Sequence, residues 1–170
     1  MKKILIYGYG NPGRQDDALG ILLVEHMECW AKENGLKSMD FDSNYQLNIE
    51  DALAISEYDF VIFADASIED ISDFVLTRVE PSQKTEFTMH AMNPEFVLHL
   101  CQSLYNKFPE TYLLHLKGYE FDFLGELTKK AERNLNEALS RLQHIFSSTN
   151  LSSEMIKENL SNQTDSIKIS

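Results

Sequence analysis

Basic residues, cysteine and long hydrophobic runs are all scarce in this chain of 170 residues. The 15 Lys and Arg residues are outnumbered by 27 Asp and Glu residues, and the net charge of −12 argues against a surface for nucleic acid or for an anionic membrane. Cys29 and Cys101 show no Cys-x-x-Cys spacing, so we expect both to be small core residues in a reducing compartment. No apolar stretch reaches the roughly 18 residues of a membrane helix. These shortages predict a soluble, cytoplasmic protein.

The chain alternates apolar strand segments with amphipathic helix segments. Apolar, buried strands of a parallel sheet are expected at residues 3–8, 59–64 and 112–117, a further strand at 38–42, and a half-exposed edge strand at 73–80. Helices are expected after Asp16, at 48–56, from Asn93 (the N-cap) to about 105, and at 125–146. This order predicts a three-layer α/β/α sandwich around a mostly parallel sheet of about five strands. The predicted domain covers residues 1–146, and residues 147–170, half of them Ser, Thr or Asn, are expected to be a polar, disordered tail.

The most informative stretch is residues 4–20, where a buried strand enters a glycine turn. Gly8, Gly10 and Gly13 form a G-x-G-x-x-G pattern, which ordinarily suggests a dinucleotide site at the N-terminus of the next helix. Two adjacent acids, Asp16 and Asp17, occupy that position instead. Their charges repel a diphosphate and attract a cation. The turn therefore predicts a metal site or a carboxylate that transfers protons.

Other titratable side chains follow the strands at the edge of a parallel sheet where ligands collect. Asp65 follows the third predicted strand, and His90 precedes the helix at 93–105. With Asp16 and Asp17 they make a set of oxygen and nitrogen ligands suited to nickel or zinc, but two approaching carboxylates can also share a proton as acid and base. Simpler roles are open as well, because Asp16 can be a helix cap, Asp65 a turn residue and His90 an ordinary surface or core histidine.

Several motifs resemble those of one known family, the hydrogenase maturation proteases. Residues 8–20 (GYGNPGRQDDALG) resemble the opening motif of that family, and residues 61–66 (VIFADA) are similar to its second motif, a strand that ends in Asp-Ala. Residues 88–90 (TMH) lie where the histidine motif is expected. Residues 116–119 and 123–128 resemble the late strand, glycine turn and helix start of these enzymes. The resemblance extends over residues 3–146.

This resemblance implies an aspartyl-type endopeptidase that removes the C-terminal extension of a nickel-iron hydrogenase large-subunit precursor after nickel insertion. It assigns Asp17, Asp65 and His90 as the catalytic and metal-contacting residues, with nickel carried by the substrate and no organic cofactor. A carboxylate beside a metal can activate water, and the metal can polarise the scissile carbonyl. The chain departs from the family pattern at Ala18, where many members have glycine. Its loop at 42–47 resembles the Tyr-Gln-Leu variant associated with soluble, cytoplasmic hydrogenases.

Two other functions fit parts of the sequence. A Rossmann-like nucleotide-binding module would use the three glycines with Asp40 or Asp42 as the ribose-binding acid. These acids follow Gly13 by 27 and 29 residues, which is long for that fingerprint. A non-catalytic chaperone would instead hold the nickel-loaded precursor without cutting it.

Overall fold

The computed structural model describes residues 2–83 and 92–148. The strands are β1 (Ile4–Tyr9), β2 (Met39–Asn44), β3 (Phe60–Ser67), β4 (Phe74–Arg78) and β5 (Glu110–Lys117). The helices are α1 (Leu19–Glu33), α2 (Asp51–Ile55), α3 (Pro94–Tyr105) and α4 (Lys129–Ser147), and a 3-10 turn, η1 (Gln15–Ala18), precedes α1. His90 and all but the first two residues of the predicted tail lie outside the described residues.

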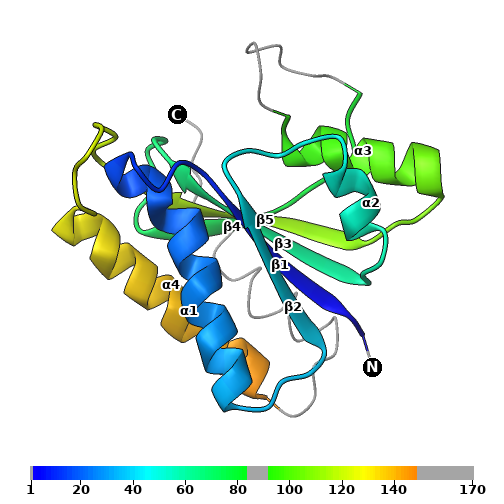
Figure 1. Ribbon diagram of the computed structural model, residues 1–170, viewed down its shortest axis with the longest axis horizontal. Helices are drawn as coiled ribbons and strands as arrows, with labels where there is room; N and C mark the ends of the chain where they lie inside the picture. The colour runs from blue at the N-terminus through cyan, green and yellow to red at the C-terminus, as the bar shows by residue number, and fades with distance from the viewer. Residues whose placement is uncertain (1, 84–91, 149–170) are drawn as a thin grey trace.

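The five strands form one sheet in the order β2-β1-β3-β5-β4. All neighbouring strands run parallel except β4, which pairs antiparallel with β5 at the edge of the sheet. Helices α1 and α4 cover one face, and α2 and α3 cover the other (Figure 1). The prediction of a three-layer sandwich with a mostly parallel sheet and an edge strand before Pro81 is therefore confirmed.

The alternation of side chains along β1 divides the core between the two faces of the sheet. Ile4 and Ile6 pack in the cluster that includes α1 and α4, whereas Leu5 and Tyr7 pack in the cluster that includes α3. Because successive residues of β3 alternate in the same way, Asp65 shares the α3 face with Phe63. This alternation places Asp65 on the face of the sheet that α2 and α3 cover.

The two cysteines differ in exposure. Cys101 is buried as predicted, but Cys29 is exposed, so its assignment to the core is wrong. Cys29 lies two positions after the buried Met27, which places it on the solvent side of α1, because two residues turn a helix by more than half a circle. Within the described residues, none of the helices combines the length and the apolar character needed to cross a bilayer.

Helix α3 starts where the sequence predicted, whereas α4 starts later than predicted. Asn93 caps α3 by accepting a 2.9 Å hydrogen bond from the Phe96 N–H, and Pro94 occupies the first position, as predicted. Helix α4 begins at Lys129, where Thr128 is the N-cap, rather than at Gly125. Residues 118–128 consequently form a long loop after β5.

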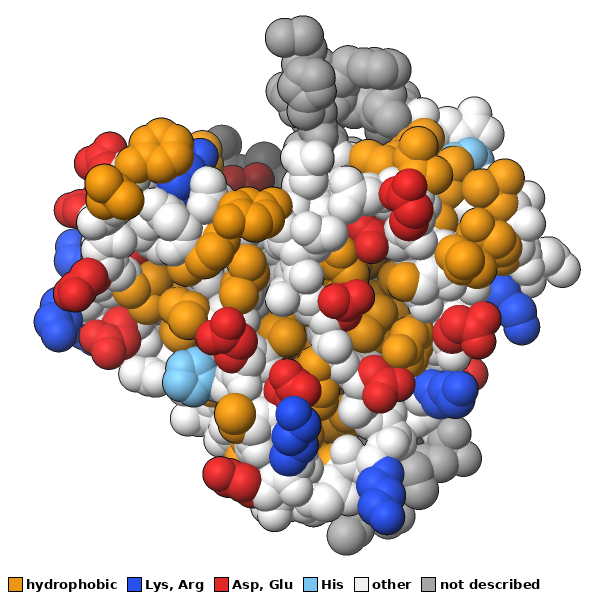
Figure 2. All heavy atoms as spheres, viewed as in Figure 1, with side chains coloured by type: hydrophobic (Ala, Val, Ile, Leu, Met, Phe, Trp, Pro, Cys, Tyr) orange, Lys and Arg blue, Asp and Glu red, His pale blue; other side chains and the backbone are white. Residues whose placement is uncertain are grey.

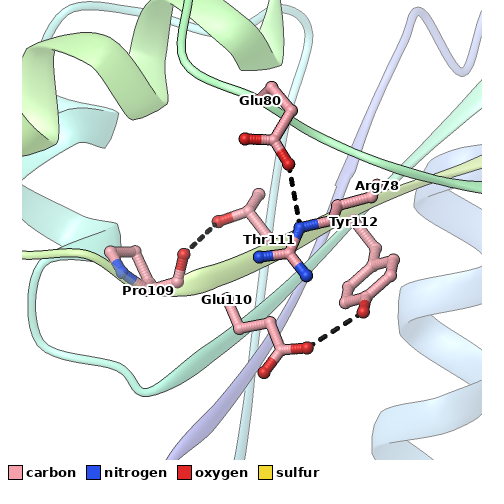
Figure 3. A network of polar contacts seen from close by, with 6 residues as sticks. All are labelled: Arg78, Glu80, Pro109, Glu110, Thr111 and Tyr112. Carbon is pink, nitrogen blue, oxygen red and sulfur yellow. Dashed lines mark hydrogen bonds and ion pairs between the residues drawn. The ribbon is translucent and has the colours of Figure 1, made fainter. Parts of the chain in front are cut away.

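A polar network marks the amino end of β5, away from the edge where the parallel strands end (Figure 3). Arg78 pairs with Glu80 at 3.0 Å, and the Tyr112 hydroxyl donates a 2.9 Å hydrogen bond to Glu110. Burial and this carboxylate raise the pKa of Tyr112 to about 12. The Arg78–Glu80 pair is mostly exposed, so it contributes little to stability.

Candidate active site

Glycines at the end of β1 and in α1 allow this helix to approach β1 and β3 closely. A Cβ on Gly8 would overlap the backbone carbonyl of Gly20 in α1, and a Cβ on Gly20 would overlap the carbonyl of Ala64 in β3. Gly10 adopts a φ of 141°, and a Cβ there would overlap the carbonyl of Asp17. The glycines at 8 and 10 thus serve close backbone packing that brings the residues around Asp17 against β1 and β3.

The amides of this glycine turn are occupied within the chain. The Asn11 N–H donates to Asp17 Oδ2 at 3.0 Å, and the Gly13 N–H donates to the Asn11 side chain at 2.8 Å. The Arg14 N–H donates to the Asn11 carbonyl at 3.1 Å. A dinucleotide site needs such amides for its phosphates. These bonds argue against the nucleotide-binding hypothesis.

Asp16 is fully buried and joins two loops that are far apart in the sequence. Its carboxylate accepts hydrogen bonds from the N–H groups of Tyr119, Glu120 and Thr128 and from the Thr128 hydroxyl, at 2.8–3.2 Å. Its side chain does not cap η1 or α1. The interpretation of Asp16 as the cap of the following helix is therefore wrong, since its four acceptor contacts are all with the loop after β5.

Asp17 and Asp65 are brought together from neighbouring strands. Asp17 lies in η1 after β1, and Asp65 lies near the end of β3, inside the strand rather than in a turn. Burial is the main cause that raises the pKa of Asp65 to about 7, and the charge of Asp17 raises it further. Two interacting carboxyls, one of them with a raised pKa, can serve as base and acid near neutral pH.

Tyr9 is a member of this site that the sequence analysis did not single out. Its hydroxyl is hydrogen-bonded to Asp65, and its ring meets Phe63 edge-on with centroids 6.4 Å apart. Burial and the Asp65 charge hold the pKa of Tyr9 well above its usual value, so the hydroxyl keeps its proton and donates to the carboxylate. The alternation of β1 was the available signal, because Leu5, Tyr7 and Tyr9 share one face.

A cavity of about 640 Å³ opens beside Asp65 on the α3 face of the sheet. It is lined by Tyr9, Asp65 and His115 from the strands and by Glu95 from the first turn of α3. His115 is the register partner of Asp65 across β3 and β5, and its ring nitrogen lies 2.9 Å from the Thr77 hydroxyl. Burial lowers the pKa of His115 and favours its neutral form. The sequence analysis did not include His115 among the candidate site residues.

The third predicted site residue, His90, lies outside the described residues. The described chain on both sides of residues 84–91 lines the same cavity, through Ser82 and Asn93. Among the described residues, no three His, Cys, Asp or Glu side chains are grouped closely enough to hold a metal ion. The metal-contacting role of Asp17, Asp65 and His90 stays a prediction.

A second cavity, of about 740 Å³, lies between the segment before β4 and the outer face of α4. Its lining mixes acids and bases of both elements, including Asp73, Glu132 and Arg133. It contains neither Asp17 nor Asp65. The paired carboxylates, rather than the larger volume, therefore identify the candidate active site.

The fold of this chain is similar to the folds of several solved structures. No protein-family model and no curated protein matches the sequence. Among solved structures, the [NiFe] hydrogenase maturation protease HycI from Thermococcus kodakarensis KOD1 has a TM-score of 0.71 at 17% identity, covering 86% of this chain and 94% of that one.

Two further structures match over similar lengths. The hydrogenase maturating endopeptidase HybD from E. coli has a TM-score of 0.66 at 18% identity and covers 87% of this chain and 94% of its own. The hydrogenase 2 maturation peptidase from Thaumarchaeota archaeon SCGC_AB-539-E09 has a TM-score of 0.62 at 20% identity, covering 86% and 99%. The chain therefore has the α/β fold of structures solved as hydrogenase maturation proteases.

Proposed function

We propose that this protein is an endopeptidase that removes the C-terminal extension of a nickel-iron hydrogenase large-subunit precursor after nickel insertion. The observation that carries the proposal is the approach of Asp17 and Asp65 at the carboxyl edge of a sheet with the fold of these proteases. The shared fold and the motifs at residues 8–20 and 61–66 support the same activity. The net charge of −12 favours a protein partner over nucleic acid or an anionic membrane.

The two carboxyls supply the acid and base chemistry of peptide hydrolysis in this proposal. Asp17, held by the Asn11 N–H, is the carboxylate that takes a proton from the attacking water. Asp65, whose pKa of about 7 leaves it partly protonated near neutral pH, is the group that can return a proton to the leaving amine. Tyr9 orients Asp65 through its hydroxyl. Asp17 thus accepts the proton that the water loses, and protonated Asp65 donates the proton that the leaving amine gains.

Nickel belongs to the substrate in this proposal, and the protein needs no organic cofactor. Asp17, Asp65 and His90 contact the loaded metal, which polarises the scissile carbonyl. The side chains thereby distinguish a loaded precursor from an empty one. We place the reaction in the cytoplasm, where this protein would meet the precursor.

The test is the mass of the purified precursor after incubation with this protein, in nickel-loaded and nickel-free form. We expect loss of a C-terminal peptide from the loaded form only. Asp17→Asn and Asp65→Asn should each reduce the rate at least about a hundredfold. Asp40→Asn is the matched control, since Asp40 lies on β2 and accepts a hydrogen bond from Tyr58.

Two results would contradict the proposal. Cleavage at the wild-type rate by both site variants would exclude the carboxylates from catalysis. A stable complex with the loaded precursor and no cleavage would instead support the chaperone hypothesis. Folding of each variant is checked by its urea unfolding midpoint.

A further inference from the structure

The loop at residues 118–128 holds two adjacent apolar side chains in solvent. Phe123 is 73% exposed and Leu124 is 98% exposed, at the tip of the loop that leads into α4. Isolated exposed hydrophobic residues are common, but a contiguous exposed pair beside a candidate active site marks an interaction surface. Tyr119, at the base of the same loop, is also 40% exposed.

This loop is fastened to the segment that carries Asp17. The Leu124 N–H donates to the Gly13 carbonyl at 3.1 Å, and the Asp122 N–H donates to the Gln15 side chain at 2.9 Å. The Arg14 guanidinium donates to the Phe121 carbonyl at 3.2 Å and lies 5.3 Å from the centre of the Phe123 ring. Four further contacts reach Asp16 from the same loop. The apolar pair is thus presented in a set position beside the candidate active site.

Backbone preference does not account for leucine at the tip. Leu124 adopts a φ of 61°, in the left-handed region that glycine and asparagine tolerate better than a branched residue. Its side chain is almost fully exposed, so burial gives no compensating stability. A leucine kept exposed in an unfavourable conformation is the pattern expected of a binding residue.

The charges around the pair indicate the chemistry of its partner. Glu120, Asp122 and Glu126 are exposed in this loop, which contains no Lys or Arg between residues 118 and 128. In Figure 2, the hydrophobic side chains at the upper left, over the yellow loop of Figure 1, have both acidic and basic side chains beside them. Arg14 contacts Phe123, but the loop itself carries three acids and no base. A complementary surface has an apolar pocket with a basic rim.

We propose that Phe123 and Leu124 form an anchor that inserts into an apolar pocket with a basic rim on the folded body of the precursor protein. The anchor holds the precursor so that its C-terminal segment reaches Asp17 and Asp65. This inference rests on the proposed function for the identity of the partner. It adds a contact that binds the precursor away from the peptide bond that is cut.

The test compares the double variant Phe123→Ser/Leu124→Asn with the wild type in binding and cleavage of the nickel-loaded precursor. Asparagine suits the left-handed backbone at 124, so the fold should be kept. We expect the Kd and KM for the precursor to rise at least about tenfold with kcat changed less than about twofold. The matched control is Leu104→Asn/Phe108→Ser, because these residues are 60% and 67% exposed at the end of α3 and in the segment before β5. It should leave both constants unchanged.

The outcomes separate the anchor from the proteolytic activity. If the wild-type protein cuts the precursor and the double variant has the same Kd and KM as the wild type, the anchor is overturned and the proteolytic function is not. A wild type that binds without cutting would overturn the peptidase function, and the Kd of the double variant would still decide the anchor. A wild type that neither binds nor cuts the precursor would overturn both.

A photo-crosslinking amino acid at position 124 identifies the protein that binds the exposed apolar pair. Leu124→p-benzoylphenylalanine in the full chain should crosslink to the precursor, at a site flanked by Lys or Arg. Crosslinks between two copies of this protein would show a self-association surface and overturn the proposal. Crosslinks to residues 149–170 of the same chain would overturn it as well.

Discussion

The carboxylate of Asp16 accepts hydrogen bonds from both the backbone N–H and the hydroxyl of Thr128, each at 2.8 Å. The two residues are 112 positions apart in the sequence. Through this contact the loop after β1 and the N-cap of α4 support each other. The neighbouring acid, Asp17, takes no part in these bonds and acts on Asp65 through its charge, so two adjacent aspartates have separate structural and electrostatic roles.

Loss of the Asp16 carboxylate should destabilise the whole domain. In Asp16→Ala, the N–H groups of Tyr119, Glu120 and Thr128 lose a fully buried acceptor, and we expect the free energy of unfolding to fall by about 3 kcal/mol. Urea denaturation measures the change. The control is Asp122→Ala, an exposed acid in the same loop, which should change stability by less than about 0.5 kcal/mol. Equal effects of the two variants would contradict the bridging role.

The carboxyl of Asp65 should make stability depend on pH. Its pKa is about 7 in the folded protein against 3.8 in an unperturbed chain, so the folded state binds the proton more tightly. Stability from this group is complete below about pH 4 and is lost as the pH rises through about 7. Relative to Asp65→Asn, the wild type should lose roughly 2–4 kcal/mol of unfolding free energy between pH 4 and pH 8.

Urea midpoints at a series of pH values test this dependence and its second cause. Asp17→Asn removes the negative charge that raises the pKa of Asp65, so its loss of stability with rising pH should be smaller than in the wild type. Parallel curves for the wild type and Asp65→Asn would show that Asp65 titrates normally.

Substitution by alanine should destabilise the protein more at Gly8 than at Gly13. A Cβ on Gly8 would overlap the Gly20 carbonyl and lie 2.8 Å from Val24, whereas the nearest atom to a Cβ on Gly13 is the Asn11 side-chain oxygen at 3.2 Å. We expect Gly8→Ala to cost about 3 kcal/mol and Gly13→Ala less than about 1 kcal/mol. Thermal unfolding compares them. Similar losses at both positions would argue against backbone packing as the reason for Gly8.

Much of the fold could be predicted because its signals are local. The apolar runs of β1 and β3 and the Asn93-Pro94 start of α3 depend on neighbouring residues alone, and all three are confirmed. The start of α4 was predicted too early, at Gly125 instead of Lys129. Threonine is a favoured N-cap residue, so Thr128 could have marked this start. The residues before it stay in a loop because they are hydrogen-bonded to the distant 13–16 segment.

The sequence alone determined the alternation of strands and helices, the glycine turn and the acids Asp17 and Asp65, because apolar periodicity and motif order are properties of the chain. Only the tertiary structure decided that Asp16 is a bridge and that Tyr9 and His115 share a cavity with Asp65. These contacts join residues 50 or more positions apart through strand register and loop packing. Local pattern carries no information about such neighbours, since they are set by how the sheet is assembled.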